Sequence, residues 1–176
     1  MAEMPTSGSG SPFWRFSLQF YRRPGVADAC IKLQEEAGVD VNLLLFLLWH
    51  ATQRRSLALP EVERLEHEVG PWRQQAVIPL RTIRRALKSP PGLLEAGDAE
   101  AFRTRIKAVE LEAERLQQEA MHDRVRARLL GVPAASVGEA ARANIAAYGG
   151  ICRAVFPQSA VEVLIAALGD MEPLPV

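Results

Sequence analysis

One pair of residues has a spacing used by metal-binding helices. Glu119 and His122 are three residues apart, which is how di-iron bundles place two ligands on one helix face. Glu63 and Glu66 form a carboxylate pair at the same spacing. A complete site of this class requires a second Glu-x-x-His, and the sequence contains none. We therefore interpret these residues as solvated charge and expect no metal and no cofactor.

The strongest local charge is basic. Residues 71–88 carry Arg73 and four further cations but no carboxylate. The four cations are spaced i, i+3, i+4 and i+7, which places them on one helix face: Arg81, Arg84, Arg85 and Lys88. Such a face suits an anion or an acidic partner. The alternative is that these side chains pair with carboxylates such as those in residues 61–68, or only solvate the helix.

Nucleic acid is the least favoured partner. Lys plus Arg and Asp plus Glu both number 21, so the chain has no overall field that attracts phosphates. Pro79 interrupts the basic helix that would have to enter a DNA groove.

A second candidate site is an aromatic pocket. Asn42 is a polar residue in the most apolar segment, and four aromatic residues could surround it: Trp14, Tyr21, Trp49 and Trp72. An apolar pocket with one or two polar groups is typical of small-molecule sites, and Arg81 could anchor an anionic ligand there. The alternative is ordinary core packing, since tryptophans are common core residues. Hydrolase and phosphate-loop motifs are absent from the sequence, which favours a noncatalytic protein.

The elements that must position these residues are predicted to be helices. Helical spacing of apolar residues and Gly or Pro breaks between them predict helices over 11–22, 26–38, 40–55, 60–70, 72–87, 98–130, 137–148 and 157–168. No alternating strand pattern is present. Residues 40–55 are apolar on nearly every side, which indicates a buried central helix. We predict an all-α fold, an irregular bundle of about six to eight helices around this one.

The predicted helix over residues 98–130 has a heptad seam. Its apolar residues are spaced four and three apart in alternation: Phe102, Ile106, Val109, Ala113, Leu116 and Ala120. This spacing is typical of helices that pair with other helices. At 1.5 Å per residue the helix is about 50 Å long, longer than a domain of this size is wide. We expect self-association through this helix, or an unknown protein partner.

The domain boundaries follow from the breaks. We predict a disordered tail over residues 1–10, a helical bundle domain over 11–130, additional short helices over 131–170 packed on or beside it, and a loose tail over 171–176. The longest apolar run, residues 39–49, is shorter than the roughly 20 residues that span a bilayer. The first residues lack the features of a secretory signal. A cytoplasmic protein without membrane contact is expected.

Three motifs in the N-terminal part resemble a known family: Phe13-Trp14-x-Phe16-Ser17, Pro24-Gly25-Val26 and Asp40-Val41-Asn42-Leu43-Leu44-Leu45-Phe46. Over about residues 13–120 the chain resembles a bacterial family of uncharacterised helical proteins, a domain of unknown function. The resemblance implies a cytoplasmic, all-helical bacterial protein and supplies no activity, cofactor or catalytic residue. Our leading hypothesis is a noncatalytic interaction protein that uses the basic face and the heptad seam. A small-molecule binding protein or enzyme with the aromatic pocket, and nucleic-acid binding, stay open as alternatives.

Overall fold

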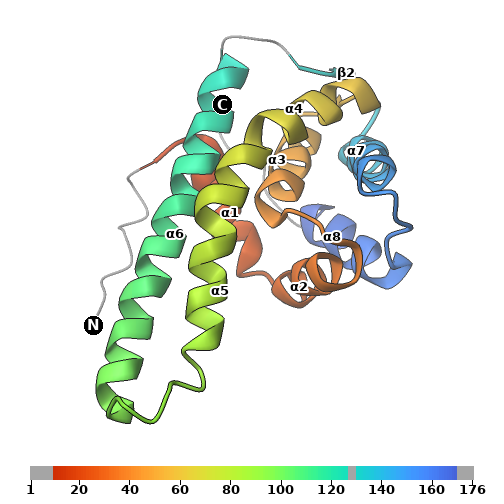
Figure 1. The fold of residues 1–176 in the computed structure, drawn as a ribbon. Helices are drawn as coiled ribbons and strands as arrows, with labels where there is room; N and C mark the ends of the chain where they lie inside the picture. The colour runs from red at the N-terminus through yellow and green to blue at the C-terminus, as the bar shows by residue number, and fades with distance from the viewer. Residues whose placement is uncertain (1–9, 127–129, 170–176) are drawn as a thin grey trace.

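A buried helix lies at the centre of the structure, as the apolar sequence predicts. The computed structural model describes residues 10–126 and 130–169. In it α3 spans Val41–Thr52, and every residue from Asn42 to Ala51 is buried. Three helices that pack against it are α1 (Pro12–Tyr21), α6 (Ala96–Arg126) and α7 (Val137–Cys152) (Figure 1). The predicted all-α bundle with a buried central helix and one long helix is confirmed.

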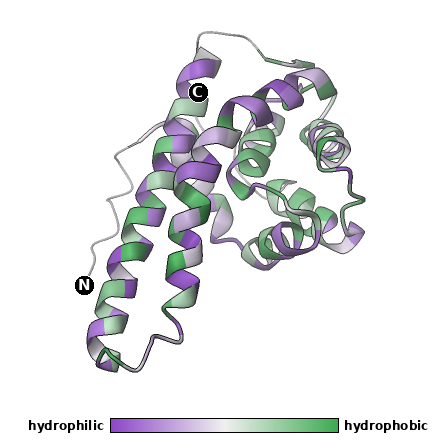
Figure 2. Cartoon of the chain, in the orientation of Figure 1, coloured by the Kyte–Doolittle hydropathy of each residue, from purple (hydrophilic) through white to green (hydrophobic). Residues whose placement is uncertain are grey.

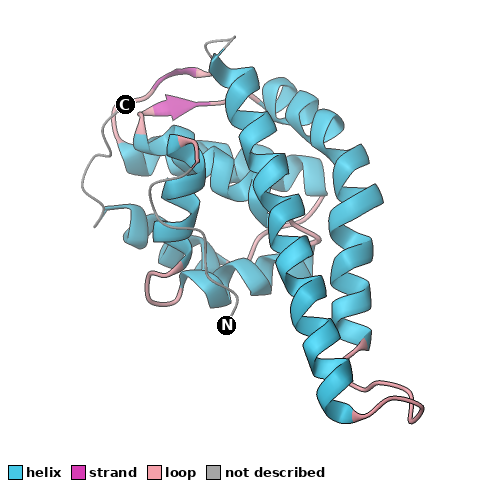
Figure 3. Ribbon diagram, turned by 90° about the vertical axis from the view of Figure 1, so that its left-hand side faces the viewer, coloured by secondary structure: helices cyan, strands magenta, loops and turns pink. Residues whose placement is uncertain are grey.

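The remaining helices surround this centre on two sides. Helices α2 (Val26–Ala37) and α8 (Gln158–Gly169) pack on each other, and α7 packs against α4 (Leu59–Trp72). Helix α5 (Ile78–Ala86) lies alongside α6, and residues 87–95 connect the two at the tip of a hairpin. Figures 1 and 3 both show the tip of this hairpin extending beyond the other helices.

The junction between α4 and α5 differs from the prediction. The sequence predicts that Gly70 and Pro71 end or kink the helix, but α4 continues to Trp72 and joins α5 through a π-helical turn, η1 (Arg73–Val77). Proline has no N–H for the helical ladder. The π-helical turn lies between Pro71 and Pro79, and in it the Ile78 N–H donates to the Arg73 carbonyl. Pro79 directly follows this turn, as the second residue of α5, so the wider turn lies where the proline ring would crowd the carbonyl four residues before it.

Helix α7 is also longer than predicted. The sequence predicts that this helix ends at Tyr148, before Gly149 and Gly150, but α7 runs to Cys152. A Cβ atom on Gly150 would lie 2.9 Å from Cδ1 of Leu59. The glycine therefore lets α7 approach the start of α4, and this packing outweighs the roughly 1 kcal/mol by which glycine disfavours a helix.

A short strand pair is a feature that the sequence did not reveal. Strands β1 (Arg55–Ser56) and β2 (Val132–Pro133) pair antiparallel, with Ser56 opposite Val132. Two residues are too few to produce a visible alternation. Gly131 has a φ of +71°, and a Cβ there would lie 2.6 Å from the Ser56 carbonyl oxygen, so the pairing requires glycine. Because of this strand, α3 ends at Thr52 and not at residue 55.

Some predicted boundaries lie outside the described residues. Helix α6 is described to Arg126, and its predicted end at residue 130 falls beyond the gap at 127–129. The two predicted tails fall largely in residues 1–9 and 170–176, which are not described. Within the ranges that are described, no helix has both the length and the apolar character to cross a membrane.

His50 makes the core sensitive to acid. Its side chain is buried, its Nδ1 lies 3.1 Å from the Phe46 carbonyl oxygen, and the ring contacts Phe46 and Trp49. Burial lowers the pKa of His50 from 6.5 to about 4. The unfolded chain therefore binds this proton more readily than the folded one, and stability is lost as pH falls from 6.5 toward 4. We expect the free energy of unfolding to fall by about 3 kcal/mol over this interval.

Urea denaturation at pH 7.0, 5.5 and 4.5 measures this effect, and the variant His50→Gln is its control. The variant lacks the titrating ring, so its free energy of unfolding should change much less between pH 7.0 and pH 4.5 than that of the parent. Equal pH dependence in the two proteins would show that the neutral ring of His50 does not govern acid stability.

Candidate functional site

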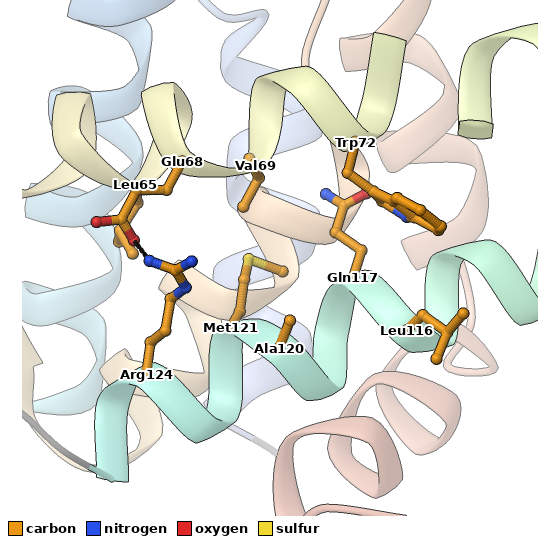
Figure 4. A pocket seen from close by; sticks show the side chains of 9 residues that line it. All are labelled: Leu65, Glu68, Val69, Trp72, Leu116, Gln117, Ala120, Met121 and Arg124. Carbon is orange, nitrogen blue, oxygen red and sulfur yellow. Dashed lines mark hydrogen bonds and ion pairs between the residues drawn. The ribbon is translucent and has the colours of Figure 1, made fainter. Parts of the chain in front are cut away.

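An apolar groove lies between α4 and the C-terminal half of α6. Helix α4 contributes Leu65, Glu68, Val69 and Trp72, and α6 contributes Leu116, Gln117, Ala120, Met121 and Arg124 (Figure 4). Its volume is about 380 Å³, within the range of about 300–1,000 Å³ that small-molecule sites occupy. On each helix the lining residues recur at spacings of three and four, so each set lies on one face. The small side chain of Ala120 leaves room between them.

Gln117 is a buried polar residue in the wall of this groove. It is 3% exposed, and Figure 4 shows its side chain extending from α6 toward α4, beside Trp72. Its Nε2 donates to Oδ2 of Asp40 at 2.9 Å. Because a carboxylate only accepts, the amide nitrogen must face Asp40. The buried Oε1 then has no hydrogen-bond partner among the described residues.

Asp40 fixes Gln117 in this orientation. Its Oδ1 caps α3 by accepting from the N–H groups of Asn42 and Leu43, at 2.8 and 3.3 Å. Its Oδ2 accepts from Nη1 of Arg73 at 2.9 Å as well as from Gln117. The Asp40 N–H donates to the Tyr148 hydroxyl at 2.9 Å. The Asp40 carboxylate thus joins α3, α6 and the π-helical turn, and the backbone N–H of the same residue adds a contact with α7.

Arg73 completes this network. Besides Asp40 it contacts Glu66, whose Oε2 accepts from Nη1 at 3.0 Å. The hydrogen bond with Glu66 is the largest cause that raises the pKa of Arg73 above its usual value, and the nearby charge of Asp40 adds to it. The guanidinium is therefore a permanent cation between two carboxylates. The π-helical turn, which begins at Arg73, is the element that brings this side chain to Asp40.

The two ends of the groove are held by different interactions. At one end Glu68 and Arg124 form an ion pair with a separation of 2.9 Å, drawn in Figure 4. At the other end the indole N–H of Trp72 donates to the Ala113 carbonyl oxygen at 3.0 Å. Trp72 keeps 41% of its surface exposed. The indole is thus fixed in position and presents apolar surface at the groove.

The comparisons with known proteins identify a family. The model of the family described as "Protein of unknown function (DUF2390)" matches residues 12–121, well over half of the chain. The chain belongs to the DUF2390 family. No curated protein and no solved structure matches the chain. The match confirms the family resemblance seen in the sequence, and it covers all lining residues of the groove except Arg124.

The aromatic residues predicted to form a pocket occupy different places in this DUF2390 fold. Trp14, Asn42 and Trp49 are buried, whereas Tyr21 is 38% exposed and Trp72 lines the groove. Asn42 does not face a ligand cavity with them: its Oδ1 accepts from Nε2 of Gln118 at 2.8 Å. Of the five, Trp72 alone is among the lining residues of the groove.

Two of the four residues in the predicted basic face form ion pairs with α6. Arg81 contacts Glu110 at 3.1 Å and Glu114 at 2.8 Å, and Arg84 contacts Glu110. Burial alone would raise the pKa of Glu110, but the hydrogen bonds from both arginines lower it below its usual value. These two cations are thus committed within the chain. Arg85 is exposed, as is Lys88.

Glu119 and His122 on α6 make contacts with different parts of the chain. Oε1 of Glu119 accepts from the Ser11 N–H at 2.9 Å, whereas His122 is buried beside Trp49 with 5.6 Å between ring centroids. In the described part of the chain, no group of three or more His, Cys, Asp or Glu side chains is arranged to hold a metal ion.

Sequence reasoning missed the groove and its polar residue. Leu65, Val69 and Met121 resemble ordinary core residues of two amphipathic helices, and their spacing shows only that they share a face. One signal for Gln117 did exist. It directly follows Leu116 of the heptad seam, so it lies beside the apolar face of the helix, where an amide side chain can be buried. Its partner Asp40 is 77 positions away, a distance that no local pattern reveals.

Proposed function

We propose that this chain is a noncatalytic binding protein whose α4–α6 groove holds a small, neutral, mostly apolar molecule with one hydrogen-bond donor. The observation that carries this proposal is Gln117, which lines a cavity of about 380 Å³ and whose buried Oε1 has no hydrogen-bond partner among the described residues. A buried polar atom without a hydrogen bond costs about 1–3 kcal/mol. A donor on the ligand would remove this penalty.

The lining determines the class of molecule. Leu65, Val69, Leu116 and Met121 favour an aliphatic or aromatic body, and the Trp72 indole offers a flat surface for an aromatic ring. The two charged lining residues, Glu68 and Arg124, pair with each other. Arg81, which was considered as an anchor for an anionic ligand, pairs instead with Glu110 and Glu114. These pairings favour a neutral ligand.

A binding role without chemistry follows from the same lining. A general base or nucleophile must lie within hydrogen-bond reach of the reacting atoms. The residues that line the groove offer aliphatic side chains, a thioether, an indole, an amide and an ion pair. We further propose a bacterial, cytoplasmic protein, as the family resemblance implies. The two cysteines, Cys30 and Cys152, are free thiols, which suits a reducing compartment.

Indole and 1-methylindole form a matched pair of probes for this groove. Indole has an apolar body and one N–H donor, and methylation replaces the donor hydrogen with a methyl group. We expect indole to bind with a dissociation constant of about 1 mM or lower. Because one hydrogen bond to Gln117 distinguishes the probes, 1-methylindole should bind about tenfold more weakly. Isothermal titration calorimetry on the full chain measures both constants.

Three variants serve as controls for this titration. In Gln117→Met the two probes should bind with similar affinity, because the acceptor is gone. Ala120→Phe should fill the groove and abolish binding of both, whereas Ala86→Phe, at an exposed position on α5, should leave it unchanged. Equal affinity of the two probes for the parent, or unchanged binding in Ala120→Phe, would refute the proposed site.

A further inference from the structure

The heptad seam of α6 is covered by the bundle on one side only. Ala113 is buried and its carbonyl accepts from Trp72, so this part of the seam faces α4 and α5. Three other seam residues are large, apolar and spaced by seven, and they stay exposed: Phe102 at 42%, Val109 at 52% and Leu116 at 44%. We call these three residues the α6 stripe. Figure 2 shows apolar and polar residues alternating along this helix.

The stripe is long enough to pack against another helix. From Phe102 to Leu116 it extends over about 21 Å at 1.5 Å per residue. It runs from the projecting half of the hairpin to the groove, where Leu116 is a lining residue. A row of apolar residues at a spacing of seven is how one helix presents a seam to a second helix of the same kind.

Charge along the stripe favours a second copy of this chain in antiparallel orientation. Arg105 follows Phe102 by three residues, and Glu112 follows Val109 by three. Glu112 also forms an exposed ion pair with Arg115 of its own helix at 2.7 Å, which Arg105 of a second copy would join. The Arg105 guanidinium carbon lies 5.5 Å from the centre of the Phe102 ring, which holds the cation beside the stripe. If two α6 helices run antiparallel about a two-fold axis at Val109, Arg105 of each copy lies level with Ala113 of the other, about 1.5 Å along the axis from Glu112. A parallel pair would instead place like charges at the same level.

We propose that the α6 stripe binds the α6 stripe of a second copy, antiparallel and centred on Val109. In this dimer Val109 packs on its equivalent, and Phe102 of the second copy packs against Leu116. Two reciprocal pairs of Arg105 with Glu112 set the register, since charges flanking a helical seam determine partner and orientation. Because Leu116 lines the groove, the second copy contributes Phe102 to its mouth. The dimer does not depend on any ligand of the groove.

Sedimentation equilibrium of the full chain tests the dimer. Between about 1 and 100 µM the mass should rise from 19.4 kDa toward twice that value. Val109→Glu should weaken association at least tenfold, because it places two carboxylates at the axis. Val155→Glu is the matched control at a position that is 98% exposed and outside the stripe, and it should have no effect. A monomer at every concentration, or a dimer unaffected by Val109→Glu, would overturn the proposal.

A charge exchange tests the register. Arg105→Glu and Glu112→Arg should each weaken the dimer several-fold, because each sets two like pairs across the interface. The double variant restores opposite charges in exchanged positions and should associate about as tightly as the parent. A double variant as weak as the single ones would contradict the antiparallel register.

Cysteine cross-linking tests the orientation independently. Under mild oxidation Val109→Cys should cross-link to itself, because the two positions meet at the axis. Phe102→Cys and Leu116→Cys should cross-link when mixed and not when alone. The parent, with its native Cys30 and Cys152, is the control for background. Self-cross-linking of Leu116→Cys would indicate a parallel pair and overturn the proposal.

Discussion

Replacing Asp40 with alanine is expected to lower the free energy of unfolding by about 4 kcal/mol, measured by urea denaturation at pH 7. The variant removes the cap of α3, a loss of about 0.5–2 kcal/mol. It also leaves Arg73 and Gln117 without the carboxylate oxygen that both contact at 2.9 Å. Removing one partner of a largely buried ion pair is strongly destabilising, by about 3–5 kcal/mol, and here Glu66 keeps part of the compensation for Arg73.

Asp40→Asn separates the two contributions. Asparagine keeps an oxygen that can cap α3 but lacks the negative charge that Arg73 faces. Its loss of stability should therefore be about half of that in Asp40→Ala. A loss below about 1 kcal/mol in Asp40→Ala would mean that the carboxylate is not the centre of this network.

Asn144→Ala is expected to destabilise the chain by about 3 kcal/mol. Asn144 is fully buried. Its Oδ1 accepts from the Leu57 N–H at 2.7 Å, and its Nδ2 donates to the carbonyl oxygens of Leu47 and Arg55 at 2.9 and 3.0 Å. These backbone groups lie in the second half of α3, in β1 and directly after β1, and each loses its side-chain partner in the variant. Unmet buried polar groups cost about 1–3 kcal/mol each, with partial relaxation.

Thermal and urea denaturation measure this loss, and Gln158→Ala provides the control. Gln158 is an exposed amide at the start of α8, so its removal should change stability by less than about 0.5 kcal/mol. If Asn144→Ala were as mild as Gln158→Ala, the connection from α3 to β1 would not depend on the amide of α7.

Local sequence patterns predicted the helices well. The contacts of Asp40 show what such patterns do not predict. The apolar run in α3 predicts a buried helix, which the structure confirms, and Asp40 caps that helix. The same carboxylate also binds Arg73 and Gln117, which are 33 and 77 positions away. Capping depends on residues within one turn. A contact across the bundle depends on how helices pack, which spacing along one helix does not determine.

The basic face gives a second example of the same limit. The alternative to a partner-binding face, that its cations pair with carboxylates in residues 61–68, holds for Arg73, which contacts Glu66. Arg81 and Arg84, however, pair with Glu110 on α6 and not with residues 61–68. Because α6 folds back along α5 after the turn at 87–95, partners some 26–33 positions away become neighbours.

The groove could not be predicted because it depends on a space between two helices. The apolar faces of α4 and α6 have the sequence pattern of helices that pack in a filled hydrophobic core. The cavity exists because Ala120 is small and Trp72 is held to the Ala113 carbonyl at the edge. The seam on α6 was predicted, but which half of it the bundle covers could be known only from the packing of α4 and α5.

A crystal structure of the full chain soaked with indole tests the binding role of the groove most directly. The proposed site predicts the indole ring between Val69, Trp72 and Met121, with its N–H about 2.7–3.2 Å from Oε1 of Gln117. An empty groove, or indole bound only elsewhere on the chain, would contradict the proposal that this cavity is a ligand site.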